Sequence, residues 1–138
     1  MTRKVSFFAT PMFLLAMFAS EALAEDASGH RENEMAYNDH CRECHAFDKN
    51  DNRLGPTLYG IVGSKAGSVP GFAYSQSVKS SGLTWDEPTL DKWIANPNAV
   101  IPDNNMGSVY GGIDDPAVRA KIIAFLKGDA MTGAQGKK

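Results

Sequence analysis

The chain has 138 residues, of which 14 are lysine or arginine and 16 are aspartate or glutamate, so its formal net charge is −2 at pH 7. A chain of this length forms one domain, and a mildly acidic balance gives no whole-molecule reason to expect nucleic acid or an anionic membrane surface as a partner. Thirteen glycines and seven prolines predict many loops around a modest apolar core, which a large central cofactor would help to stabilise.

The first 24 residues contain the three parts of a secretory signal peptide. A basic start at Arg3 and Lys4 is followed by an apolar run at residues 5–19 and by a small-x-small exit at residues 22–24. A retained membrane anchor is the alternative, but the run is interrupted by a threonine and a proline and is shorter than the roughly 20 residues that span a bilayer. We therefore expect cleavage after residue 24, no membrane span in the mature chain and a location in the periplasm.

Residues 30–40 predict a short amphipathic helix that leads directly into the motif C-R-E-C-H at Cys41–His45. Both cysteines of the chain lie in this motif, three positions apart. A disulfide is the simplest alternative in an exported chain. A redox C-x-x-C pair usually accompanies a βαβ pattern, which this sequence lacks. Structural zinc needs four ligands, and the three histidines supply no credible fourth one.

C-x-x-C-H is the attachment signature of c-type haem. On one helical segment, Cys41 and Cys44 can reach two neighbouring vinyl groups, and the adjacent His45 can turn its imidazole onto the iron. The sequence therefore predicts one covalent haem c per chain, held by Cys41 and Cys44, with His45 as the proximal iron ligand.

A glycine- and proline-rich loop is expected at residues 47–75. Residues 75–82 then predict a single helical turn that ends at a glycine. Residues 84–97 predict a longer helix with an acidic start, a proline in its first turn and a stop at Pro97.

The second iron face needs a ligand, and the methionines are the candidates. Three of the six lie in the predicted signal peptide, and Met35 lies only ten residues before His45 on the helix that leads into the motif. Met131 lies in a tail, residues 129–138, without a periodic apolar face, and we expect this tail to be mobile. Met106 lies in a long, proline-stiffened loop about 60 residues beyond His45, which lets it wrap to the opposite side of the haem. Met106 is therefore the predicted distal ligand, and an ordinary loop methionine is the alternative.

Residues 114–128 predict the last helix, with Asp114 or Asp115 as N-cap, a proline in the first turn and Gly128 just past the end. An apolar stripe runs along it. With no internal repeat and no linker, the pattern predicts an all-α domain of about four short helices and long loops over residues 25–128.

Several motifs in this order resemble the class I c-type cytochromes. They are CRECH, LGPTLYGIVGSKAG, PGFAYSQSVKSSGLTWDEPTLDKWIANPN, IPDNNM and RAKIIAFLKG, and together they cover roughly residues 35–127. The resemblance is to the branch of mitochondrial cytochrome c and bacterial cytochrome c2, and it extends to cytochrome cH of methylotrophs. It implies a small all-α haem protein in which the first and last helices pack together, with Tyr37 against Ile122 and Phe125.

The resemblance also implies roles for single residues. The Pro56 carbonyl would accept a hydrogen bond from the proximal histidine and so orient it. Tyr74 and Trp85 would hydrogen-bond a buried haem propionate, with ordinary aromatic core as the alternative for both. Met106 falls at the distal ligand, and Trp93 takes the place of a tyrosine above it. An indole can donate one hydrogen bond but cannot accept one.

The chain departs from this family at positions that bear on charge. Ser64 stands where the family often has an arginine near the inner propionate, and its effect on the potential is left open. Mitochondrial cytochromes c surround the exposed haem edge with lysines. None of the corresponding positions here is lysine: His40, Asn98, Ala99, Asn105, Asp114 and Asp115. We therefore expect a redox partner with a basic or largely apolar face.

A neutral thioether opposite a histidine favours ferrous iron and raises the reduction potential. The sequence thus predicts a monomeric one-electron carrier of fairly high potential, not an enzyme. Its partners would be a terminal oxidase, a quinol-oxidising complex, or another periplasmic cytochrome or dehydrogenase. The alternative is a haem peroxidase or ligand sensor with a labile distal ligand. That function needs an acid–base group above the iron, and Asp103 is the one carboxylate of the Met106 loop.

Overall fold

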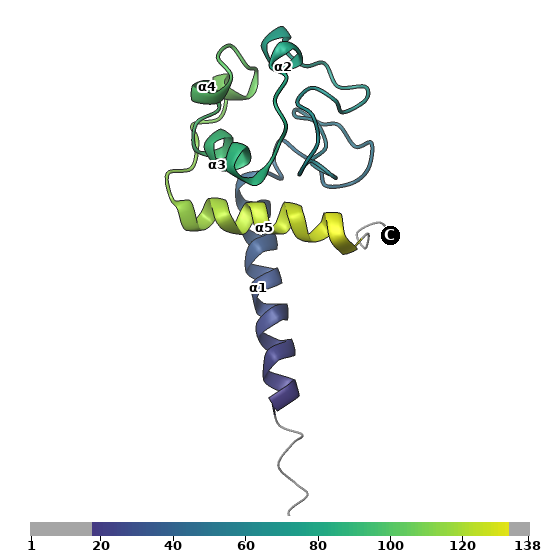
Figure 1. Ribbon diagram of the computed structural model, residues 1–138, viewed down its shortest axis with the longest axis vertical. Helices are drawn as coiled ribbons and strands as arrows, with labels where there is room; N and C mark the ends of the chain where they lie inside the picture. Colours follow the sequence, from purple (N-terminus) through teal and green to yellow (C-terminus); the bar gives the residue numbers. More distant parts are fainter. Residues whose placement is uncertain (1–17, 133–138) are drawn as a thin grey trace, which may run out of the picture.

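The computed structural model describes residues 18–132 (Figure 1). Its regular structure within that range is helical, with one isolated antiparallel bridge between Lys65 and Thr84. The elements are α1 (Phe18–His40), α2 (Gln76–Ser80), α3 (Glu87–Ala95), α4 (Pro97–Val100), the 3-10 turn η1 (Met106–Ser108) and α5 (Pro116–Thr132). The all-α prediction is confirmed.

Both terminal helices are longer than the sequence predicts. Helix α1 begins at Phe18 rather than near residue 30, and α5 continues through Gly128 to Thr132. Glycine in a helix costs only about 1 kcal/mol, so Gly128 does not end α5. Residues 1–17 and 133–138, which hold most of the predicted signal peptide and tail, lie outside the described residues. Cleavage after residue 24 stays a prediction. Among the described helices, none is both long and apolar enough to cross a membrane.

Helix α5 lies across α1, with α2, α3, α4 and the long loops on one side of it (Figure 1). At the crossing, the rings of Tyr37 and Phe125 stack with centroids 4.7 Å apart and an interplanar angle of 25°. The Phe47 ring lies 5.1 Å from that of Phe125, and Ile122 is fully buried beside them. This confirms the predicted contact between the first and last helices. Such an aromatic pair adds about 0.5–1.5 kcal/mol to the burial of its rings.

Local sequence explains where α3 and α5 begin. The Asp86 carboxylate accepts a hydrogen bond from the Thr89 N–H at 2.9 Å, and the Asp115 carboxylate accepts one from the Ala117 N–H at 2.8 Å. Each side chain satisfies a backbone donor that the first turn leaves free. Asp115, rather than Asp114, is therefore the cap of α5.

Two short elements, α4 and η1, were not predicted. Helix α4 starts immediately after α3, where the Asn96 side chain accepts from the Ala99 N–H at 3.2 Å and Pro97 occupies the first turn. Four- and three-residue elements are too short to show a helical period in the sequence. They matter because they carry the chain from α3 to Met106.

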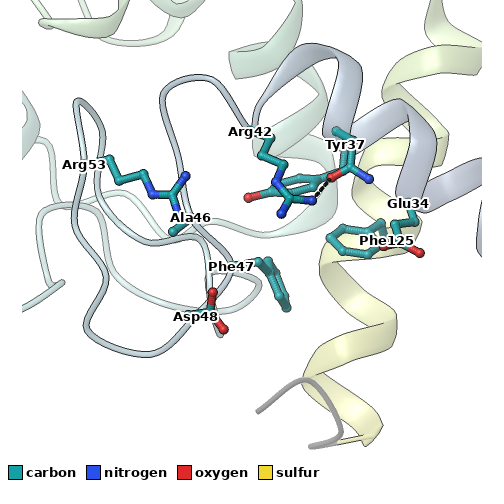
Figure 2. Close-up of a pocket in the computed structure, with 9 residues that line it drawn as sticks. Glu34, Tyr37, Arg42, Ala46, Phe47, Asp48, Arg53 and Phe125 are labelled. Atoms are coloured by element: carbon teal, nitrogen blue, oxygen red, sulfur yellow. Dashed lines mark hydrogen bonds between the residues drawn. The ribbon is translucent and has the colours of Figure 1, made fainter. Parts of the chain in front are cut away.

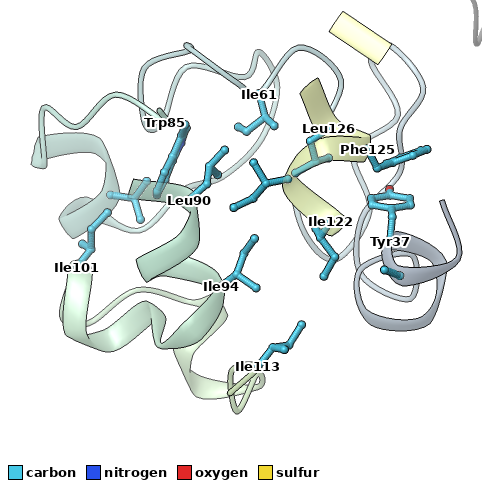
Figure 3. Packing of buried hydrophobic residues seen from close by; sticks show 13 residues of the cluster. Tyr37, Ile61, Trp85, Leu90, Ile94, Ile101, Ile113, Ile122, Phe125 and Leu126 are labelled. Carbon is cyan, nitrogen blue, oxygen red and sulfur yellow. The ribbon is translucent and has the colours of Figure 1, made fainter. Parts of the chain in front are cut away.

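The core lies between α3 and α5 (Figure 3). Trp85, Leu90 and Ile94 meet Ile122 and Leu126 there, and each is less than 10% exposed. The core thus joins the α1–α5 crossing to the helix that carries Trp93.

An ion pair links α5 to α3. Arg119 of α5 donates through Nε to the Asp91 carboxylate of α3 at 2.7 Å and through Nη1 to the carbonyls of Ile113 and Asp114. Gly112 precedes this link with φ +89°, where a Cβ would overlap the Ala95 carbonyl. These contacts fasten the chain between Met106 and α5 onto α3.

Candidate haem site

The two cysteines and the histidine lie on one turn at the end of α1. The Cys44 N–H and the His45 N–H both donate to the Cys41 carbonyl, at 3.1 and 2.9 Å. Both cysteines are free, partly buried thiols. Burial, reinforced by the nearby Cys44, raises the pKa of the Cys41 thiol to about 12. The turn therefore presents two thiols and an imidazole within five residues, as covalent haem attachment requires.

The His45 ring is buried and oriented by one hydrogen bond. Its Nδ1 lies 2.7 Å from the Pro56 carbonyl oxygen. Because a carbonyl can only accept, Nδ1 carries the proton and Nε2 keeps its lone pair. Burial lowers the pKa of His45, opposed by the bond to Pro56. The ring is thus a neutral nitrogen donor with a fixed orientation, and the predicted role of Pro56 agrees with this geometry.

Gly55 leaves room for the His45 ring. A Cβ at this position would overlap the imidazole, and the Gly55 N–H donates to the Cys44 carbonyl at 2.7 Å. The loop before Pro56 therefore lies directly against the ring, which only a residue without a side chain allows. The sequence signal is the glycine before Pro56, whose steric role becomes visible only in the folded chain.

Met106, at the start of η1, is half-buried and its sulfur is hydrogen-bonded. Trp93 of α3 donates from Nε1 to the Met106 sulfur at 3.2 Å. The Trp93 ring packs against Trp85 with centroids 5.0 Å apart, which holds the indole in place. The structure thus brings together the predicted distal ligand and the aromatic residue predicted above it.

Trp93→Phe should lower the midpoint potential by about 20–60 mV, the equivalent of one neutral hydrogen bond of about 0.5–1.5 kcal/mol. The indole N–H withdraws electron density from the sulfur, so its loss makes the thioether a better donor to ferric iron. Potentiometric titration measures the shift. Trp93→Tyr is the matched control, because a phenol can also donate to the sulfur, and it should keep most of the potential. A Phe variant with the wild-type potential would show that the bond does not tune the iron.

Trp85 and Ser64 lie side by side, and Tyr74 packs against the same hydrophobic cluster as Trp85. Trp85 is buried, and its backbone N–H donates to the Ser64 carbonyl at 2.8 Å. The Ser64 hydroxyl donates to the Ile61 carbonyl at 2.8 Å. Tyr74 is half-buried against Phe72, and burial raises the pKa of its phenol. Their contacts to a propionate stay predictions.

A cavity of about 140 Å³ lies beside the Cys41–His45 turn, between α1, the loop after His45 and α5 (Figure 2). Its walls carry charges of both signs, from Glu34, Asp48, Arg42 and Arg53. Small-molecule sites usually measure about 300–1,000 Å³. This cavity is therefore below the size of a haem or of an ordinary substrate.

The donor set fits a haem iron and two thioether links. It offers a neutral imidazole nitrogen, a thioether sulfur and two thiols. Among residues 18–132 no group of three or more histidine, cysteine, aspartate or glutamate side chains could hold a metal ion. The chemistry of the donors thus favours haem over a zinc site.

No family model matches the chain. Cytochrome c2 iso-2 of Magnetospirillum fulvum is 48% identical over 87 residues, which cover 63% of this chain and 88% of that protein. Cytochrome c2 of Rhodomicrobium vannielii is 51% identical over 87 residues, covering 62% and 68%. The structure of cytochrome cH from Methylobacterium extorquens superposes with a TM-score of 0.65 at 44% identity, covering 72% of this chain and 97% of that one. The chain belongs to the class I c-type cytochromes.

As a class I cytochrome c, the protein is a small electron carrier with covalent haem c. The family resemblance inferred from the motifs is confirmed. The sequence did not reveal which polar groups hold the Met106 segment of this cytochrome. Asn98 and Asn104 contact that segment, and their side chains give no signal in a pattern of apolar residues.

Proposed function

We propose that this cytochrome c is a periplasmic one-electron carrier whose haem is linked to Cys41 and Cys44 and ligated by His45 and Met106. The observation that carries the proposal is the position of the Met106 sulfur, half-buried and fixed by the Trp93 N–H at 3.2 Å. A thioether held in this way keeps a lone pair for a metal. The predicted signal peptide supports the periplasmic location.

Bound haem supplies one iron that exchanges a single electron between its ferric and ferrous states. The protein's own residues then set the conditions of that exchange. His45 is fixed by Pro56, and Met106 is fixed by Trp93, so neither ligand needs to move. A neutral sulfur ligand and a dry core both favour ferrous iron. With both ligands in place, no open position is left for a substrate, which is why we propose a carrier rather than an enzyme.

The peroxidase or sensor alternative has less support. It needs a distal residue that leaves the iron and an acid–base group to act there. Asp103, the carboxylate of the Met106 loop, is exposed, and Met106 is hydrogen-bonded.

The proposed docking face is nearly free of positive charge. The six positions that are lysines in mitochondrial relatives are all exposed here: His40, Asn98, Ala99, Asn105, Asp114 and Asp115. Arg119 lies beside the two aspartates and partly offsets them, since one of its Nη groups donates to the Asp114 carbonyl at 2.8 Å. We therefore propose a weakly acidic face that meets a basic or largely apolar one, on a terminal oxidase as acceptor. The donor would be a quinol-oxidising complex, or another periplasmic cytochrome or dehydrogenase.

The function is tested by mixing the reduced protein with oxidase-containing membranes of its own organism and following haem oxidation as salt is varied. Rapid oxidation that slows with salt would support docking on a basic oxidase face, and rapid oxidation independent of salt would support an apolar one. Slow oxidation at every salt concentration would contradict the oxidase as acceptor and place the protein upstream.

Asp114→Asn/Asp115→Asn should slow oxidation several-fold at low salt and flatten its salt dependence, because patch charge steers the encounter. Asparagine still caps a helix, so α5 should keep its start. Glu32→Gln/Glu34→Gln on α1 changes the net charge equally and serves as the control. If the Asp114→Asn/Asp115→Asn variant keeps the wild-type salt dependence, the proposal that these two carboxylates steer the encounter is wrong.

A further inference from the structure

Asn98, Asn104 and Gly107 form a closed triangle of hydrogen bonds next to Met106. The Asn104 Oδ1 accepts from the Gly107 N–H at 2.6 Å, and the Asn98 Nδ2 donates to the Gly107 carbonyl at 3.1 Å. The Asn104 Nδ2 closes the triangle by donating to the Asn98 Oδ1 at 3.0 Å. Both polar backbone groups of the residue after Met106 are thus held by side chains.

The triangle is anchored to the rest of the fold through both asparagines. Asn104 is only 5% exposed, and its Nδ2 also donates to the Ile101 carbonyl at 2.7 Å. Asn98 belongs to α4, which follows α3 directly. Helix α3 carries Trp93. The consecutive helices α3 and α4 therefore hold Met106 at its sulfur and at the backbone of the next residue, Gly107.

The triangle closes tightly at Gly107. A Cβ on Gly107 would overlap the Asn98 amide, so the close approach requires glycine. A surface hollow of about 360 Å³, lined in part by these three residues, brings solvent up to them. The triangle is therefore the wall between solvent and the Met106 segment on this side.

A hydrogen bond from α2 holds the same segment from another side. The Ser77 hydroxyl donates to the Asp103 carbonyl at 2.9 Å, across 26 positions of sequence. Asp103 has φ +58°, a left-handed conformation that a non-glycine residue adopts at a cost. The segment from Ile101 to Ser108 is thus held by side chains of α2, α3 and α4.

We propose that the Asn98–Asn104–Gly107 triangle is the positioning device that keeps the Met106 sulfur in place and so excludes small anions such as cyanide from the iron. This inference rests on the proposed assignment of Met106 as distal ligand. For Met106 to leave, the η1 turn must move, and that movement breaks the two bonds to Gly107. Asn98 and Asn104 thereby keep external ligands off the iron, so that the protein works as an electron carrier and not as a ligand-binding haem protein.

The test measures how fast cyanide binds the ferric holoprotein, together with the sulfur–iron absorption band and unfolding by denaturant. Asn98→Ala removes two bonds of the triangle at an exposed position and should speed cyanide binding about tenfold. Asn104→Asp keeps the acceptor for Gly107 but loses both donors, and should also speed binding. Asn105→Ala is the control, because the Asn105 side chain makes none of the bonds of the triangle, and it should bind cyanide at the wild-type rate.

Met106→Ala separates this inference from the proposed function. If Met106→Ala keeps the sulfur–iron band, the ligand assignment itself is wrong. If Met106→Ala loses the band and binds cyanide at once, while Asn98→Ala and Asn104→Asp bind it at the wild-type rate, only the triangle proposal is overturned. Lower stability of the asparagine variants without faster cyanide binding would show a merely structural role and would also overturn it.

Discussion

Met106→Ala is expected to lower the midpoint potential by roughly 0.2 V or more. Axial ligands set the reduction potential of haem over a range of roughly 0.8 V. The neutral sulfur favours ferrous iron, and water in its place stabilises ferric iron instead. The sulfur–iron band of the ferric protein should disappear together with the high potential. Spectroelectrochemical titration of the purified protein records both quantities in one experiment.

Met35→Ala is the matched control for this change, because Met35 is a methionine with 61% of its surface exposed on α1. It should leave the band and the potential unchanged. A Met106→Ala protein that kept the wild-type potential would mean that another group ligates the iron.

Phe125→Ala should lower the free energy of unfolding by about 3–5 kcal/mol, the usual cost of removing a large buried aromatic side chain. Phe125 stacks on Tyr37 at 4.7 Å and contacts Phe47 at 5.1 Å, so its loss opens the crossing of α1 and α5. The Cys41–His45 turn follows α1 directly, and the expected loss therefore extends to the stability of haem attachment. Denaturant unfolding of the holoprotein, followed by far-UV circular dichroism, measures the effect.

Val109→Ala provides the comparison, because the Val109 side chain is 70% exposed. A surface change of this kind should stay within about 0.5 kcal/mol. A loss below about 1 kcal/mol for Phe125→Ala would show that the α1–α5 crossing contributes little to the fold.

The parts of the fold that the sequence predicted are those with local signals. Helices α3 and α5 carry an acidic cap, a proline in the first turn and an apolar stripe, and all of these act within a few residues. The cap of α5 was narrowed to Asp114 or Asp115, and the hydrogen bond to Ala117 decides for Asp115. The contact between Tyr37 and Phe125 came from the family resemblance and is confirmed.

The parts that the sequence missed depend on contacts between distant segments or on very short elements. Helix α4 has four residues and η1 has three, so neither shows a period. The end of α5 was placed too early, because a glycine weakens a helix without stopping it. The asparagine triangle was not predicted either, because nothing in the isolated sequence tells a structural asparagine from a solvated one.

The candidate site divides in the same way. The Cys41–His45 turn is a local motif, and its residue spacing alone predicted haem attachment. On the distal side, the chain must bring Met106 next to Trp93, and the family resemblance predicted this contact. The hydrogen bond from the Trp93 Nε1 to the Met106 sulfur is visible only in the folded chain. The steric need for Gly55 beside His45 likewise follows only from the structure.

A spectroelectrochemical titration of the wild-type holoprotein tests the central claim, a closed haem ligated by His45 and Met106, most directly. The predicted result is a single one-electron transition at fairly high potential, with a sulfur–iron band in the ferric form and slow cyanide binding. A low potential, an absent band and immediate cyanide binding would contradict the closed site and favour the peroxidase or sensor alternative.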